Sequence, residues 1–163
     1  LNRLSLNLEF QHTQKIVRVI KNIGDITVRS NLTDYNFKVS ETILNNQSDI
    51  LKKLNNTNTS FYSSSRGVDE CNIVVSDNLT SLIEENFGGE LLIKKTEKLS
   101  AISFKLPSEN VSVPGIYYYV FQKLSWDGIN ISQVISTSNE FTILVSEDEV
   151  DNAFSVINKL KNI

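Results

Sequence analysis

The sequence is poor in several residues that often carry chemistry. Its 163 residues include no methionine, one cysteine, one histidine and two prolines. A single cysteine excludes an intramolecular disulfide and fits a reducing compartment. No apolar run approaches the ~18 to 20 residues of a membrane span, and no signal pattern opens the chain. We therefore expect a soluble, cytoplasmic protein without a membrane partner. Because methionine is absent, we also expect a fragment or processed chain that lacks residues before Leu1.

Charge and motif content exclude two further classes. The net charge is −3, and the basic residues form only pairs such as Lys52-Lys53 and Lys94-Lys95, whereas nucleic-acid binding needs clustered Lys and Arg. Neither Gly-x-Gly-x-x-Gly nor Gly-x-x-x-x-Gly-Lys-Ser/Thr, the glycine-rich phosphate loops, occurs. We therefore expect no nucleic-acid partner for this region and no kinase activity.

Residues suited to catalysis or metal binding are scattered. His12 lies in a polar stretch without a Cys or Ser motif, which favours an exposed, functionless side chain. Cys71 falls in a predicted strand, which favours a buried, inert thiol. Glu147, Asp148, Glu149 and Asp151 are clustered, but acids at a helix start suit the helix dipole. We predict a non-catalytic protein with no metal and no cofactor.

Residues 101–160 carry the clearest pattern. Ile102, Phe104 and Leu106 alternate with small or polar residues, as in a strand with one buried face. Apolar residues after Pro114-Gly115 fall at helical spacing, and Gly128 marks the end of that helix. The pattern predicts strand, helix, strand, strand and helix, over 101–107, 116–127, 129–137, 140–145 and 150–160.

An internal repeat extends this order to the first half of the chain. Residues 70–77 match 140–147, and 36–39 match 103–106. The first copy predicts a helix at 41–54, strands at 60–65 and 70–76, a helix at 79–87 and one further strand at 90–94. Two βαββα units in tandem give an α+β, ferredoxin-like fold class, with antiparallel sheets covered by helices.

The repeat also predicts the domain organisation. We expect a first module at 35–98 and a second at 99–163, preceded by an N-terminal segment at 1–34 that packs on the modules. In that segment, residues 1–10 fit a strand or a helix, 13–23 form an amphipathic helix, and two β-prone pieces lie at 26–29 and 35–39.

The phrases Val113-Pro114-Gly115-Ile116-Tyr117 and Gly128-Ile129-Asn130-Ile131 resemble the ACT domain, an amino-acid-sensing module of regulated biosynthetic enzymes. The similarity is greatest to the tandem ACT regulatory tail of aspartate kinases, whose catalytic half has no counterpart here. It covers residues 101–160 and implies paired modules that share a continuous sheet. Members that bind amino acids usually carry Asp or Asn where this chain has Ser112. The first copy has Ser40-Glu41-Thr42-Ile43 at the equivalent turn, with Ser40 as the expected N-cap and no ligand.

A Pro-Gly turn at a helix start directs backbone N–H groups and the positive helix end outward, which suits an α-carboxylate. The resemblance implies a ligand between this loop and a strand from a partner module, with Asn130 and Gln133 accepting hydrogen bonds from the ammonium. The expected ligand-binding residues are Ser112, Val113, Pro114, Gly115, Ile116, Asn130, Ile131, Ser132 and Gln133. The alternative is that Pro114-Gly115 only starts a helix.

These observations favour a regulatory protein that senses an amino acid through paired ACT modules and signals to a partner or to a missing N-terminal domain. We expect a homodimer or higher homo-oligomer through sheet edges and ACT interfaces. A ligand-free oligomerisation module is the alternative. An RNA-binding sheet is a third hypothesis, but the predicted strands at 129–137 and 140–145 offer one aromatic residue, Phe141, and no Lys or Arg. The sequence names neither the effector nor the output partner.

Overall fold

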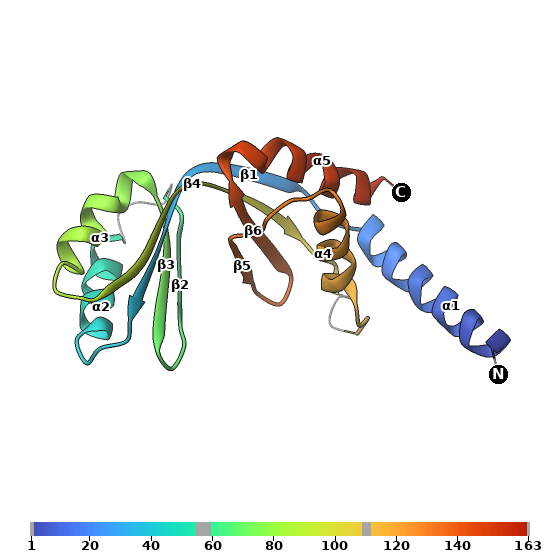
Figure 1. The fold of residues 1–163 in the computed structure, drawn as a ribbon, viewed down its shortest axis with the longest axis horizontal. Coiled ribbons are helices and arrows are strands. Elements are labelled where there is room, and N and C mark those ends of the chain that lie inside the picture. Colours follow the sequence, from blue (N-terminus) through green and yellow to red (C-terminus); the bar gives the residue numbers. More distant parts are fainter. Residues whose placement is uncertain (1, 55–59, 109–111, 163) are drawn as a thin grey trace. The chain divides into compact units, whose positions relative to one another are not determined.

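The computed structural model describes residues 2–54, 60–108 and 112–162, with residues 2–10 described by their backbone alone. The chain folds into two compact units (Figure 1). One comprises residues 1–29 and 100–163, and we call it the split unit. The other comprises residues 30–99, and we call it the inserted unit. The α+β fold class is confirmed, and the strands follow the hydrogen-bonded order β2-β3-β1-β4-β6-β5.

The inserted unit is an antiparallel sheet with two helices on one face. Tyr35 on β1 lies opposite Ile73 on β3, which in turn lies opposite Ser64 on β2. The side chains of Tyr35, Phe37 and Ile73 point into a core that α2 and α3 cover. The elements of this unit are β1 (Ile26–Lys38), α2 (Ile43–Leu54), β2 (Tyr62–Arg66), β3 (Glu70–Ser76), a 3-10 turn (Asp77–Leu79), α3 (Thr80–Asn86) and the first part of β4 (Leu92–Lys105).

The split unit repeats this arrangement and adds a helix. Phe104, Phe141 and Ile143 lie in its core, together with apolar residues of α1, α4 and α5. Antiparallel pairing joins β5 to β6, with Ser136 opposite Phe141. Besides the start of β1 and the end of β4, its elements are α1 (Asn2–Lys21), α4 (Ile116–Trp126), β5 (Gln133–Ser136), β6 (Glu140–Ser146), a 3-10 turn (Glu147–Glu149) and α5 (Val150–Lys161).

Two long strands differ from the sequence prediction. The separate β-pieces expected at 26–29 and 35–39 are one strand, β1, and those expected at 90–94 and 101–107 are one strand, β4. Asn31 (φ 59°) and Lys98 (φ 56°) adopt the left-handed region inside these strands. A local irregularity of this kind lets a strand continue through a polar stretch that otherwise resembles a turn. The predicted segment 1–34 is therefore divided between the units, and the predicted modules 35–98 and 99–163 overlap the units without coinciding with them.

The structure also decides three smaller predictions, on the first helix, on the strand after α4 and on the end of α4. The backbone of residues 2–21 is one helix, which resolves the choice between strand and helix at the start of the chain. The strand predicted at 129–137 is confined to Gln133–Ser136, because Ile129 bonds back to α4 through its N–H and the carbonyl of Leu124 (3.0 Å). Gly128 ends α4 with a positive φ of 71°, as expected of a helix stop.

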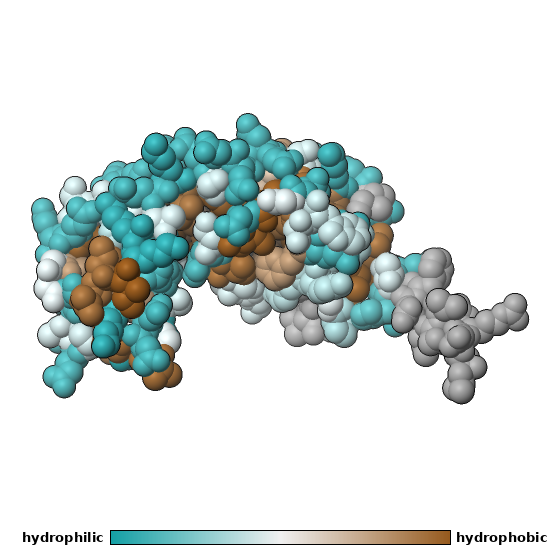
Figure 2. Space-filling model, in the orientation of Figure 1, coloured by the Kyte–Doolittle hydropathy of each residue, from teal (hydrophilic) through white to brown (hydrophobic). Residues whose placement is uncertain are grey.

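Most large apolar side chains are buried, but α2 also presents apolar residues to solvent. Leu44 is 51% exposed and Leu51 is 46% exposed. Figure 2 shows hydrophobic surface around α2 and α3. Within the described ranges, no helix is both long and apolar enough to cross a membrane.

Candidate functional site

The Pro-Gly loop leads directly into α4. Gly115 is the N-cap residue with φ 91° and ψ 3°, a left-handed conformation that glycine adopts without steric cost. Its carbonyl accepts the N–H of Tyr119 (3.0 Å), the first bond of the helix. Ser112 and Pro114 are exposed, whereas Val113 packs against the core of the split unit and Ile116 is buried in it. Val113 and Ile116 therefore fix the loop on the core of the split unit.

This helix start favours an anion. Gly115 has no side chain to cap the helix, so the N–H groups of the first turn point toward the space above the loop. The helix dipole adds partial positive charge there, which contributes about 0.3–1 kcal/mol to an exposed anion. Tyr117 holds the start of α4 against the sheet, because its ring stacks on Phe141 (centroids 5.0 Å apart) and its hydroxyl lies 3.2 Å from Ser136 Oγ.

Helix α1 also contacts this loop, which the sequence analysis missed. A Cβ atom added at Gly115 would lie 3.2 Å from Ile16 Cδ1 and 3.6 Å from His12 Nε2. His12 is exposed, as expected, yet it lies beside the predicted ligand loop rather than apart from it. About one hundred residues separate α1 from Gly115, so no local sequence pattern could reveal the contact.

The second group of predicted residues, 130–133, lies just after α4. The Asn130 side chain is exposed, and its backbone N–H donates to Glu149 Oε1 (3.4 Å). Glu149 Oε2 also accepts from Ser146 Oγ (3.3 Å). Ile131 packs on the core, and Ser132 donates its N–H to the carbonyl of Leu144 (2.8 Å). Gln133 opens β5 and is half-buried.

The carboxylate of Glu149 makes this second group attractive to a cation. The sequence analysis assigned the acids at 147–151 to the start of a helix and overlooked their position beside Asn130. Asp127 follows the last residue of α4, at the negative end of the helix dipole. The 130–133 segment therefore combines side-chain amides with carboxylates, a set that accepts hydrogen bonds from an ammonium group.

The structure does not bring the two groups together. Residues 112–116 lie at the start of α4, whereas 130–133 follow its end. At about 1.5 Å per residue, the 11 residues of α4 separate them by about 16 Å. One copy of the unit therefore cannot hold a small amino acid between them.

The equivalent turn of the inserted unit differs in chemistry. Ser40 caps α2, since its Oγ accepts the N–H of Ile43 (3.1 Å), as expected. Three side chains donate to the Glu90 carboxylate: Ser40 Oγ to Oε2 (2.5 Å), Thr42 Oγ1 to Oε1 (2.6 Å) and Asn46 Nδ2 to Oε1 (2.7 Å). Burial raises the pKa of Glu90, but the three hydrogen bonds outweigh it and leave the pKa below its usual value. This helix start already holds a carboxylate.

Other titratable groups belong to the structure of the inserted unit. Cys71 is fully buried, as expected, and burial raises the pKa of its thiol. Tyr35 donates its hydroxyl to Glu84 (3.0 Å), and burial followed by this bond raises the pKa of Tyr35 to about 12. Among the described residues, no group of three or more His, Cys, Asp or Glu is placed to hold a metal ion.

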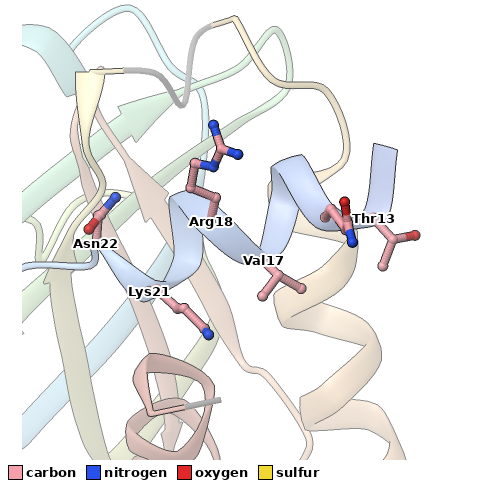
Figure 3. A pocket seen from close by; sticks show the side chains of 6 residues that line it. Thr13, Val17, Arg18, Lys21 and Asn22 are labelled. Atoms are coloured by element: carbon pink, nitrogen blue, oxygen red, sulfur yellow. The ribbon is translucent and has the colours of Figure 1, made fainter. Parts of the chain in front are cut away.

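A hollow of about 670 Å³ lies along α1 (Figure 3). Arg18 points to one side of the helix, whereas Val17 and Lys21 point to the other. The described residues that line it are Thr13, Gln14, Val17, Arg18, Lys21 and Asn22, and none of the predicted ligand-binding residues is among them. Five of these residues lie on α1 and Asn22 follows its last residue, so one segment of the chain supplies the described lining.

Searches with protein-family models and against curated proteins find no match. Solved structures are similar over most of the chain. The aspartate kinase of Clostridium acetobutylicum superposes with a TM-score of 0.70 and 20% identity, over 86% of this chain and 35% of that one. The ligand-free regulatory subunit of aspartate kinase from Thermus thermophilus gives a TM-score of 0.64 at 10% identity, over 85% of this chain and 97% of that one.

The chain has the fold of an aspartate kinase regulatory region. Escherichia coli aspartokinase III, in complex with lysine and aspartate, agrees with this (TM-score 0.60, 15% identity, covering 86% of this chain and 32% of that one). The chain thus spans about a third of these whole kinases, and it covers nearly all of the separate regulatory subunit. This confirms the tandem ACT-type fold that the sequence resemblance implied.

Proposed function

We propose that this chain is a non-catalytic regulatory protein that binds a free amino acid at the start of α4 and signals to a partner protein or domain. The observation that carries the proposal is the opposite chemistry of the two ends of α4. Its start offers N–H groups to an α-carboxylate, and the segment after its end offers amide and carboxylate oxygens to an α-ammonium. Similarity to regulatory subunits of aspartate kinase supports the regulatory role.

Two copies of the chain complete the proposed site. β5 is an outer strand of the sheet, and an outer strand can pair with a second copy. Antiparallel pairing of two β5 strands would set Gln133 of each copy near Ser136 of the other. Because Tyr117 at the start of α4 contacts Ser136, the 130–133 segment of one copy would then approach the Gly115 loop of the other. A homodimer would contain two such sites related by symmetry.

Thermal unfolding of the full chain with each of the twenty amino acids tests the binding. One amino acid should raise the midpoint, since a ligand of the native state stabilises it. Gly115→Asp should abolish the shift by placing a negative charge where the carboxylate binds. Gly67→Asp is the control, because it adds the same charge at an exposed turn of the inserted unit, away from both proposed halves of the site.

Mixing two defective variants tests whether the site is shared. Gly115→Asp damages the loop, and Glu149→Lys damages the ammonium side, so neither homodimer should bind. A heterodimer retains one intact site, and an equal mixture should recover about a quarter of the wild-type capacity. Absence of recovery would contradict the shared site. If the wild type responds to no amino acid, a ligand-free oligomerisation module becomes the better description.

A further inference from the structure

The inserted unit repeats the fold of the split unit, yet its first helix begins differently. Its helix α2 starts after a β-strand, as α4 does, and Ser40 takes the place of the glycine at the cap. The Glu90 carboxylate lies over this start and accepts hydrogen bonds on both oxygens. Glu90 comes from the loop between α3 and β4, 44 to 50 positions beyond the three residues that donate to it.

The backbone holds Glu90 in this position. Its N–H donates to the carbonyl of Phe87 (2.9 Å), which closes the turn after α3. On its other side, the carbonyl of Leu91 accepts the N–H of Lys38, the last residue of β1 (2.9 Å). The loop is therefore anchored beside the very turn that contains Ser40 and Thr42. A tethered carboxylate loses little conformational freedom when it binds, so it competes strongly with any free carboxylate.

We propose that Glu90 is a built-in occupant of the effector position of the inserted unit, where its carboxylate stands in for that of an amino acid and closes the unit to free effectors. Only the split unit then remains open. The inference rests on the proposed function, because only that function makes the start of α2 equivalent to an effector-binding position. The internal contact itself can be tested with a simple carboxylate.

Glu90→Ala should vacate the position, and acetate is the probe. The melting midpoint of this variant should rise by about 3 °C in 100 mM sodium acetate relative to the same concentration of sodium chloride. Any response of the wild type to acetate comes from the open start of α4, so the readout is the additional rise that Glu90→Ala shows over the wild type. Glu41→Ala, which removes an exposed carboxylate from the same turn, is the matched control and should behave as the wild type. Adding Thr42→Val to Glu90→Ala should abolish this additional rise, because Thr42 Oγ1 donates to the carboxylate position.

Several outcomes would overturn the proposal. An equal response of Glu90→Ala to acetate and chloride would mean that the turn does not bind carboxylates. Acetate should also restore the folding of Glu90→Ala if loss of the carboxylate unfolds it. Failure of Glu90→Ala to fold in either salt, while Glu90→Gln folds, would therefore also contradict a carboxylate-binding position. Amino-acid titration separates this result from the proposed function. If the wild type binds one effector per chain, Glu90→Ala should bind two. If the wild type binds none but acetate rescues Glu90→Ala, the internal contact stands and the sensor function fails.

Discussion

Replacing Gly115 with alanine tests the contact between α1 and the loop that precedes α4. With φ at 91°, an alanine here pays about 1–2 kcal/mol for a left-handed backbone. Its Cβ would also lie 3.2 Å from Ile16 Cδ1, so one of the two must move, and overpacking of this kind costs about 1–3 kcal/mol. We expect Gly115→Ala to lower the free energy of unfolding of the split unit by about 2–5 kcal/mol.

Gly128→Ala isolates the backbone part of this cost. Gly128 has a φ of 71°, and nothing lies within 4 Å of its added Cβ, so the expected loss is only the 1–2 kcal/mol of strain. The two variants differ by the overpacking cost of about 1–3 kcal/mol, so their melting midpoints should differ by about 2–12 °C for a chain of this size. Far-UV circular dichroism and the fluorescence of Trp126, which ends α4, follow the transition.

A double-mutant cycle then assigns the difference to Ile16. Ile16→Val removes the Cδ1 atom that the new Cβ would meet, at a cost of its own of about 0.5–1.5 kcal/mol. In this background, Gly115→Ala should cost no more than Gly128→Ala. Equal destabilisation by the two glycine substitutions in the wild-type background would refute the packing of α1 on the loop. An undiminished difference in the Ile16→Val background would refute the role of Ile16.

Three further predictions concern the inserted unit. Burial raises the pKa of Asp34, so its contribution to stability is greatest below its ordinary value of 3.8 and is lost as the pH rises through the raised value. Urea unfolding from pH 4 to 8 should therefore show Asp34→Asn to be at least as stable as the wild type at pH 7, with a smaller loss of stability as the pH rises. Tyr35→Phe should lower the free energy of unfolding by about 1 kcal/mol through loss of the bond to Glu84, and a normal urea midpoint would contradict that bond's contribution. Cys71 should react with a thiol reagent only in denaturant, since it is fully buried, and rapid labelling of the native protein would contradict this.

Most of the fold could be predicted from the sequence because the apolar residues of each module recur at the regular spacing of strands and helices. The strand at Glu70–Ser76 matches its prediction, since Cys71, Ile73 and Val75 alternate into the core. The continuity of β4 could not be read in this way. Residues 92–98 are mostly exposed and include several charges, so their strand conformation depends on pairing with β1 and not on burial. Propensity alone gives no signal for such a strand.

The candidate site was predictable only where it is local. The Pro114-Gly115 pair predicts a helix start with an unusual backbone conformation, and Gly115 is the N-cap residue of α4 in the structure. The approach of Glu149 to Asn130 and that of α1 to Gly115 depend on tertiary packing between distant segments. Glu90 carried no signal either, because the sequence around it reads as the stop of one helix followed by a strand.

The cap residue explains why two copies of one fold should differ in response. Ser40 satisfies one N–H of α2 with its own hydroxyl and still has a proton to donate, so its turn requires an acceptor, which Glu90 supplies. Gly115 has no side chain and so supplies neither group at the start of α4. An internal carboxylate stabilises the inserted unit at every effector concentration, whereas an external one stabilises the split unit only when it is bound. Under the proposed function, the split unit is therefore the one whose stability would follow the concentration of an amino acid. Helix α1, which contacts its loop through Ile16 and His12, would then be placed to pass on the change.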